Sequence, residues 1–149
     1  MRAVLTRVKS ASVSADGQIT GQIGPGFLVL LGIAPADGPA QVKKLAQKVC
    51  GMRIFTDENG KMSRSLADIG GSLLVVSQFT LFADCKKGNR PGFTGAAGPD
   101  TAIPLYESFL SACTALGFPP QHGIFGAHME VASVNDGPVT IWLDTDALM

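Results

Sequence analysis

Hydrophobic and polar residues alternate along several short stretches of the chain, which is the pattern of half-buried β-strands. Residues 2–14 show this alternation and are rich in β-branched side chains, so they predict a strand. Asp16-Gly17 is a common hairpin turn, and residues 18–23 are expected to return beside the first strand. The apolar run at 27–33 predicts a fully buried strand.

Two segments show a helical period instead. In residues 39–50 the apolar side chains fall on one face, and Asp37 is a plausible cap for the start. Residues 101–116 repeat the pattern, and Gly117 is a typical helix end. Shorter strands are predicted at 52–55, 73–79, 127–134 and 139–144, the last two as a hairpin joined by Asn135-Asp136-Gly137-Pro138, and a long Gly- and Pro-rich loop at 84–100.

Together these elements predict one α+β domain that spans residues 1–149, a curved and mostly antiparallel sheet or barrel with two helices packed on it. The composition is 46% hydrophobic and 16% charged, which favours a packed globule over a disordered chain. Twelve basic residues balance twelve acidic ones, although nine of the basic residues fall in residues 1–75. Overall charge therefore indicates no polyanionic partner, and any contact with RNA must be local.

The cysteine and histidine content argues against a metal site. Cys50, Cys85 and Cys113 form no CxxC pair, and only two histidines are present, so neither a zinc site nor a disulfide framework is expected, and no cofactor is implied. The N-terminus lacks the pattern of a signal peptide, and the longest apolar run is about a third of a membrane span. We therefore expect a cytoplasmic protein with no membrane partner.

Common catalytic motifs are missing, since the sequence has neither a P-loop nor a GxSxG elbow. His128 is expected to be a satisfied structural histidine and His122 a solvated one. The segment Ser77-Gln78-Phe79-Thr80-Leu81 is more unusual, because it ends the most apolar strand with polar side chains. Buried polar groups are costly when unpaired, so this strand end either frays into a polar loop or presents its polar groups to a ligand. The composition leaves both interpretations open.

The segments Ser77–Leu81 and Asn135–Thr140 together resemble the D-aminoacyl-tRNA deacylase family, whose hallmarks are an SQFTL strand end and an NxGPVT turn. Both motifs are unaltered here. The resemblance extends over nearly the whole chain, from Met1 to about Asp144. Other segments that look like the family are Arg2-Ala3-Val4, Ile23-Gly24-Pro25-Gly26, Arg53-Ile54-Phe55 and Phe125-Gly126-Ala127-His128-Met129.

The resemblance implies a homodimeric hydrolase that cleaves the ester between a D-amino acid and the 3′-terminal adenosine of tRNA. Such an enzyme serves translation quality control and D-amino acid metabolism, and its nucleic-acid partner is aminoacyl-tRNA, not DNA. The resemblance also implies that Gly137-Pro138 is cis and enters the partner subunit's pocket, where it excludes L-amino acids. Arg7 is expected to hold this loop across the dimer. Glycine has no Cβ to clash, so glycyl-tRNA mischarged on tRNA(Ala) is an expected substrate.

The roles of individual residues follow from the same resemblance. Ser77, Gln78 and Thr80 would form the catalytic segment, Phe79 would pack against the terminal adenine, and Met129 would line the pocket. From the sequence alone, the last two side chains could equally fill the core. Thr80 is the family's candidate nucleophile, but a threonine hydroxyl needs an activating base and the local sequence supplies none. We favour activation by the vicinal ribose hydroxyl of the substrate.

Lys86, Lys87 and Arg90 lie in the predicted long loop. They either contact phosphates of the tRNA acceptor stem or form a solvated charge cluster. Two other functions stay open at this point. One is a non-catalytic module that binds the tRNA 3′ end, suggested by the missing acid–base machinery, and the other is a domain that binds free amino acids.

Overall fold

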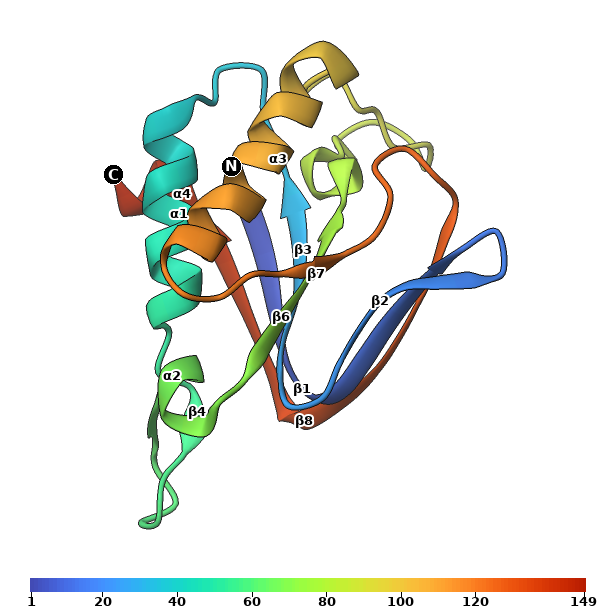
Figure 1. The fold of residues 1–149 in the computed structure, drawn as a ribbon. Coiled ribbons are helices and arrows are strands. Elements are labelled where there is room, and N and C mark those ends of the chain that lie inside the picture. The colour runs from blue at the N-terminus through green and yellow to red at the C-terminus, as the bar shows by residue number, and fades with distance from the viewer.

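A single long strand is the centre of the sheet in the computed structural model, which describes residues 1–149 (Figure 1). This strand, β1 (Arg2–Ala15), pairs antiparallel with β2 (Gln18–Ile23) along its second half and with β3 (Gly26–Gly32) along its first half. The sheet continues through β6 (Ser72–Ser77), which is parallel to β3, and β7 (Gln121–His122), which is parallel to β6. Antiparallel and parallel pairings therefore occur in one sheet.

The other edge of β1 is covered by a second long strand, β8 (Met129–Asp144). The two are antiparallel along almost their whole length, from the pair Arg2–Asp144 to the pair Ala15–Met129. Their register shifts on both sides of Val8. Both strands bend at this place (Figure 1), and the bend separates the half of the sheet that carries the helices from the half that curls on itself.

The curled half forms a nearly closed barrel. β2 approaches β7 so closely that a Cβ added at Gly21 would lie 2.9 Å from the carbonyl oxygen of His122. Only a glycine allows this approach of the two backbones. The barrel interior is filled by a cluster of buried apolar side chains, Val8, Ala11, Val13, Ile23, Leu28, Leu74 and Val76.

Two helices, α1 (Pro39–Gly51) and α3 (Pro99–Ala115), lie side by side against the sheet (Figure 1). They cover the larger core of 22 buried residues. The apolar face of α1 that the sequence predicts is buried there, and the Gln41 side chain accepts a hydrogen bond from the Gly38 amide at the helix start. No helix in the structure has the length and hydropathy of a membrane span.

Several short elements complete the chain. β4 (Phe55–Thr56) and β5 (Met62–Arg64) form a separate two-stranded sheet that projects beyond the end of α1 (Figure 1). The helix α2 (Leu66–Ile69) precedes β6, a 3₁₀ turn η1 (Phe79–Phe82) follows it, and α4 (Thr145–Leu148) follows β8.

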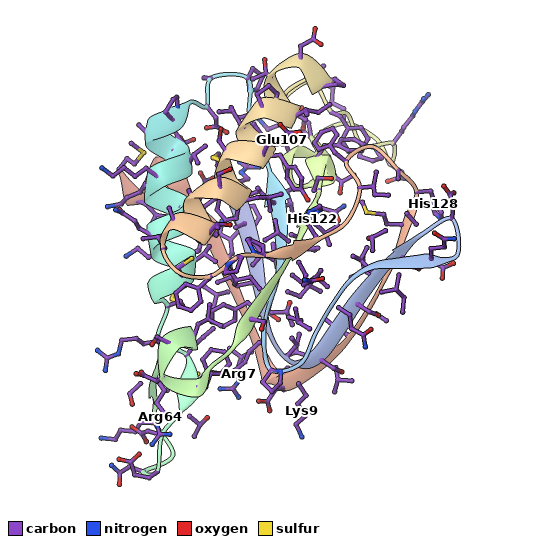
Figure 2. The ribbon with its side chains drawn as sticks, in the orientation of Figure 1. Arg7, Lys9, Arg64, Glu107, His122 and His128 are labelled. Atoms are coloured by element: carbon purple, nitrogen blue, oxygen red, sulfur yellow. The ribbon has the colours of Figure 1, made fainter.

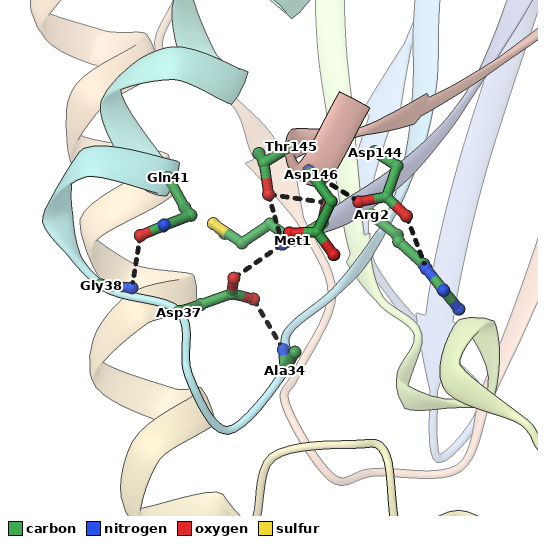
Figure 3. Close-up of polar contacts among 9 residues, drawn as sticks. All are labelled: Met1, Arg2, Ala34, Asp37, Gly38, Gln41, Asp144, Thr145 and Asp146. Atoms are coloured by element: carbon green, nitrogen blue, oxygen red, sulfur yellow. Dashed lines mark hydrogen bonds and ion pairs between the residues drawn. The ribbon is translucent and has the colours of Figure 1, made fainter. Parts of the chain in front are cut away.

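A buried polar network joins the start of β1 to α4 and to the connection between β3 and α1 (Figure 3). The amino group of Met1 donates to Asp37 Oδ1 at 2.8 Å and to Thr145 Oγ1 at 2.7 Å. Asp37 Oδ2 also accepts from the Ala34 amide at 2.7 Å. Both side chains of the Met1–Asp37 ion pair are buried, 0% and 7% exposed, so each charge depends on the other for its stabilisation.

The predicted α+β class and the curved sheet are confirmed. Most strand pairs in this sheet are antiparallel, as predicted. The predicted hairpin of 127–134 and 139–144 is wrong, because both segments belong to the single strand β8 and pair with β1. Asn135–Pro138 bulges out of this strand, and such a polar, Gly- and Pro-containing segment is common to turns and bulges alike. The strand predicted at 52–55 is also wrong except for Phe55, with which β4 begins.

Two elements have boundaries that differ from the predicted ones. The second large helix begins at Pro99, inside the predicted loop, because proline is favoured in the first turn, where its missing N–H is no loss. The strand predicted at 73–79 ends at Ser77, and the 3₁₀ turn takes over.

Asp37→Ala should lower the free energy of unfolding by about 3 kcal/mol, because it leaves a buried ammonium group without its partner. Chemical denaturation measures the change. Glu58→Ala is the control. It breaks an exposed ion pair, in which the side chain of Arg64 is 45% exposed and that of Glu58 is 71% exposed, so the free energy of unfolding should change far less. Similar losses for the two variants would contradict the role assigned to Asp37.

Candidate functional site

The segment Ser77–Leu81 lies where the buried strand β6 leaves the sheet. Ser77 is the last paired residue, opposite Leu31, and the Gln78 amide still donates to the Leu31 carbonyl at 2.7 Å. The chain then turns into η1, where the Leu81 amide donates back to the Gln78 carbonyl at 3.2 Å. The strand end is therefore an ordered turn with polar side chains, not a frayed loop.

Two residues elsewhere in the chain keep η1 in place. Gly32 leaves room for it, because a Cβ there would come within 3.1 Å of the Gln78 carbonyl oxygen and of the Leu81 side chain. Arg2 holds it from the other side. Its Nη1 donates to the Leu81 carbonyl at 2.9 Å, its guanidinium lies 4.3 Å from the centre of the Phe82 ring, and its Nε pairs with Asp144 at 3.0 Å.

The polar side chains of this segment interact with each other. The side-chain amide of Gln78 donates a hydrogen bond to the Thr80 hydroxyl. Phe79 is 56% exposed and meets the edge of Phe93 with 5.0 Å between ring centres. An aromatic ring so exposed beside polar groups is a suitable surface for stacking a base. The prediction that Phe79 is available to a ligand agrees with its exposure, whereas a core role does not.

The first part of this segment opens onto a cavity of about 270 Å³, whereas Thr80 is exposed and is not among the lining residues. Ser77, Gln78 and Phe79 form one wall, and the segment Phe125–Met129 forms another. Met129 lines the cavity as expected and also packs against the barrel interior. The rest of the lining is largely apolar and comes from Leu31, Ile33, Val76, Ala97, Ala102 and Val131.

Behind the cavity, the helix α3 is fastened to β6 by Tyr106. Its buried hydroxyl donates to the Val75 carbonyl at 3.3 Å, and burial raises the pKa of Tyr106 to about 12. Tyr106 therefore stays protonated at neutral pH and serves as a hydrogen-bond donor within the core.

The cavity contains almost no acid–base groups. His128 is its only titratable lining residue, and no carboxylate lines it. His128 is exposed, so the prediction of a satisfied structural histidine is wrong. Its sequence neighbours Ala127 and Met129 are half-buried and line the same cavity. His122 lies outside the cavity, and its Nδ1 is 2.7 Å from the Gly123 carbonyl oxygen. The Thr80 hydroxyl accepts a hydrogen bond from the Gln78 side chain, and no carboxylate or imidazole is hydrogen-bonded to it.

Gly137 and Pro138 lie at the tip of the bulge in β8. Val8 pairs with Asn135 and Thr6 pairs with Thr140, so four residues of β8 face one residue of β1. The extra residues leave the sheet. The Gly137-Pro138 bond is cis, and Gly137 has a φ of 146°, a backbone conformation that favours glycine.

Arg7 holds this bulge. Its Nε donates to the Asp136 carbonyl at 2.8 Å, and its Nη1 donates to the Ile54 carbonyl at 2.7 Å. Its side chain is 9% exposed. Within the bulge, Asn135 Oδ1 accepts from the Val139 amide at 3.0 Å. The structure thus brings Arg7 and the Gly137-Pro138 segment together within one chain, whereas the resemblance implies a contact across the dimer.

The two motifs do not meet within one chain. Ser77 pairs with Leu31, which pairs with Ala3 of β1. The bulge lies opposite Arg7, which is four residues, or about 13 Å, from Ala3 along β1. Across the sheet, β8 and β6 lie on opposite sides of β1 and are about three strand spacings apart. The cavity and the Gly137-Pro138 bulge are therefore at separate places on the molecule.

Lys86, Lys87 and Arg90 are exposed in a loop whose ends are joined by the Asp84–Gly92 bridge. None of the three makes an ion pair. The same loop leads to Phe93, which contacts Phe79. The loop therefore borders the cavity. No group of three or more His, Cys, Asp or Glu side chains is arranged to hold a metal ion.

The fold and the site define a small α+β protein with an apolar cavity at the end of a buried strand. The family model for D-Tyr-tRNA(Tyr) deacylase matches residues 4–144. The chain belongs to this family of hydrolases, as the two motifs predict. A D-aminoacyl-tRNA deacylase of Deinococcus radiodurans is 56% identical over 97% of this chain and 99% of its own length. One of Thermomicrobium roseum is 56% identical over 99% of this chain and 96% of its own.

Two solved structures share the fold. The c-Myc DNA Unwinding Element Binding Protein has a TM-score of 0.91 and 41% identity, with 97% of this chain and 98% of that chain covered. A probable eukaryotic D-amino acid tRNA deacylase has a TM-score of 0.79 and 17% identity, with 95% of this chain and 97% of that chain covered. The second likeness concerns the fold alone.

Arg7→Lys should destabilise the protein by about 1–3 kcal/mol, because an ammonium group cannot bridge the Ile54 and Asp136 carbonyls and leaves a buried acceptor unpaired. Faster hydrogen exchange of the Val139 amide should show that the bulge has loosened. Arg64→Lys, at a half-exposed ion pair, is the control and should change neither measurement appreciably. An unchanged bulge in Arg7→Lys would contradict the role of the guanidinium.

Proposed function

We propose that this protein hydrolyses the ester bond of D-aminoacyl-tRNA and releases the D-amino acid and tRNA. The observation that carries the proposal is the intact SQFTL segment, of which Ser77, Gln78 and the exposed Phe79 line a cavity. Relatives that are 56% identical over nearly the whole chain are named D-aminoacyl-tRNA deacylase. Action on aminoacyl-tRNA is consistent with a cytoplasmic protein of translation quality control.

In the proposed complex, the terminal adenine stacks on Phe79 and the aminoacyl group enters the cavity. The Gln78 side-chain amide and the backbone of residues 77–80 orient the ester. The backbone N–H groups of this segment that are not used in the sheet stabilise the oxyanion, an effect worth roughly 3–4 kcal/mol for each donor in well-studied cases. The lack of a carboxylate in the cavity supports a reaction in which the substrate supplies its own assistance. The vicinal ribose hydroxyl activates the attack, and Thr80 positions Gln78 and the ester.

Selection of the D-configuration is assigned to Gly137 and Pro138 of a partner subunit. Within one chain the bulge cannot reach the cavity, so the two motifs can act together only across a dimer. The outer edge of β8 supports such an interface, because it pairs with no other strand. It carries the exposed apolar side chains of Val131, Val134 and Trp142, and Val131 also lines the cavity.

A wall made of main-chain atoms explains broad specificity. Such a wall touches the substituents of the substrate's α-carbon, so it reads handedness without reading the side chain. Glycine has no Cβ that would clash with these main-chain atoms, so the enzyme should also accept glycyl-tRNA, including glycine mischarged on tRNA(Ala). Phosphates of the acceptor stem contact Lys86, Lys87 and Arg90 in the loop that borders the cavity.

Deacylation rates of D-tyrosyl-tRNA and L-tyrosyl-tRNA, measured side by side at neutral pH without added metal, test the proposal. Rapid loss of the D-ester alone is expected at catalytic protein concentration. Loss of both esters would contradict chiral selection but not hydrolysis. Binding of tRNA without loss of either ester would favour a non-catalytic tRNA 3′-end module, and tight binding of free D-amino acids without tRNA would favour an amino-acid-binding domain.

Gly137→Ala should reduce the ratio of D- to L-deacylation at least tenfold. The new Cβ would lie 2.7 Å from the Val139 amide nitrogen and 3.3 Å from Arg7 Nη2, so the wall must move. Gly24→Ala is a matched control, because a Cβ there meets nothing within 4 Å. An unchanged D/L ratio in a folded Gly137→Ala protein would argue against the main-chain wall.

Thr80→Ala should retain most of the activity, whereas a substrate ending in 2′-deoxyadenosine should react about 10²-fold more slowly or worse, as expected for loss of an assisting hydroxyl. Single-turnover deacylation measures both rates. If Thr80→Ala folds and binds tRNA but is inactive, while the deoxy substrate reacts normally, Thr80 is the nucleophile and substrate assistance is wrong.

A further inference from the structure

A basic groove lies at the C-terminal end of α1, outside the cavity described above. It has a volume of about 370 Å³ and is lined by Lys44, Gln47, Lys48, Gly51, Met52 and Arg53. Three of these six residues carry a positive charge and none carries a negative one. We refer to these six residues as the basic groove.

The cations of the basic groove are not neutralised by the protein. None of Lys44, Lys48 and Arg53 takes part in an ion pair. Arg53 uses its Nε to bind the Ser63 carbonyl at 2.7 Å. The nearest acidic influence is Asp68, whose pKa is lowered mainly by hydrogen bonds from Ser65 and to a smaller extent by the charge of Arg53.

A structural role accounts for only part of this charge. Lys48 lies in the last turn of α1, where one cation balances the partial negative charge of the helix end. Two further cations in the same groove exceed that need. Like charges held close together repel each other, so an anion that lies among them would be stabilised.

The Arg53 end of the basic groove is connected to the Gly137-Pro138 bulge. Arg7 joins them, because one guanidinium binds both the Asp136 carbonyl, next to Gly137, and the Ile54 carbonyl, next to Arg53. Figure 2 places Arg7 near the strand bend, on the same side as Arg64 and well away from His128, which lines the cavity.

We propose that the basic groove binds backbone phosphates of the tRNA acceptor stem whose aminoacyl end occupies the partner subunit's cavity. The inference rests on the proposed function, since a bulge that enters the partner's cavity carries the adjoining groove to the mouth of that cavity. Each tRNA is then held by both subunits. Lysine and arginine contacts to phosphates position RNA without reading its sequence, which suits an enzyme that acts on several tRNAs.

The double variant Lys44→Gln/Lys48→Gln tests the groove. Its kcat/KM for D-tyrosyl-tRNA should fall roughly tenfold, and the slope of log kcat/KM against log salt should become shallower by about two. Its rate on D-tyrosyl-adenosine, which lacks the acceptor stem, should not change. Lys43→Gln is the matched control, because Lys43 lies on the same helix but lines a different groove, between α1 and α3.

Mixed dimers test the contact across the interface. One subunit carries Gln78→Ala/Phe79→Ala to inactivate its cavity, and the groove variant is placed on either subunit. The reference is the mixed dimer that has one inactivated cavity and two intact grooves. Its activity should be retained when the active cavity and the intact groove are on different subunits, and should fall tenfold when they are on the same subunit. The reverse order would overturn the proposal.

The outcomes separate the two proposals. A wild-type protein that hydrolyses neither D-tyrosyl-tRNA nor D-tyrosyl-adenosine refutes the proposed function, and the groove inference with it. A wild-type protein active on both, with groove variants that behave like Lys43→Gln, refutes only the groove inference.

Discussion

The position of the Gly137-Pro138 bulge depends on one buried guanidinium. Arg7 extends from the bend of β1 and binds carbonyl oxygens from two other parts of the chain, the segment after α1 and the bulge in β8. A buried cation is tolerated only when hydrogen bonds replace its water, and the carbonyls of Ile54 and Asp136 do so. The same bonds fix the bulge against the sheet. A projecting loop of this length would otherwise move freely, and the chiral wall proposed for it requires a fixed position.

The cavity at the other end of the sheet is built on the opposite principle. Here the polar groups are exposed and the scaffold behind them is apolar. β6 is buried as far as Val76, and the chain then turns sharply because Gly32 leaves space for η1 and Arg2 binds its last turn. The half-buried Gln78 and the exposed Phe79 and Thr80 therefore have fixed positions although they lie at the surface. Their accessibility is what a polymeric substrate such as tRNA requires.

Local patterns in the sequence were enough to predict β1, β2, β3 and α1, because each is set by neighbouring residues. The hairpin predicted at 127–144 failed for a non-local reason. Whether Asn135–Pro138 is a turn or a bulge depends on whether β1 is long enough to pair with both flanking segments, which no local pattern records. The exposure of His128 was missed similarly, since apolar neighbours in sequence do not imply burial in an irregular segment. Phe79 and Met129 could be placed at the site only through the family resemblance.

Separation of the two motifs in the fold has a physical consequence for the proposed enzyme. A cavity that must admit a tRNA end has to be open, whereas a wall that reads handedness has to be rigid and close to the α-carbon. One chain meets the first demand at the end of β6 and the second at the bend of β8, about 13 Å further along β1. In a two-fold dimer the same surface on each subunit supplies both parts, so each wall completes the partner's cavity. The open edge of β8, which runs from the cavity past the bulge, is the surface that such a dimer would share.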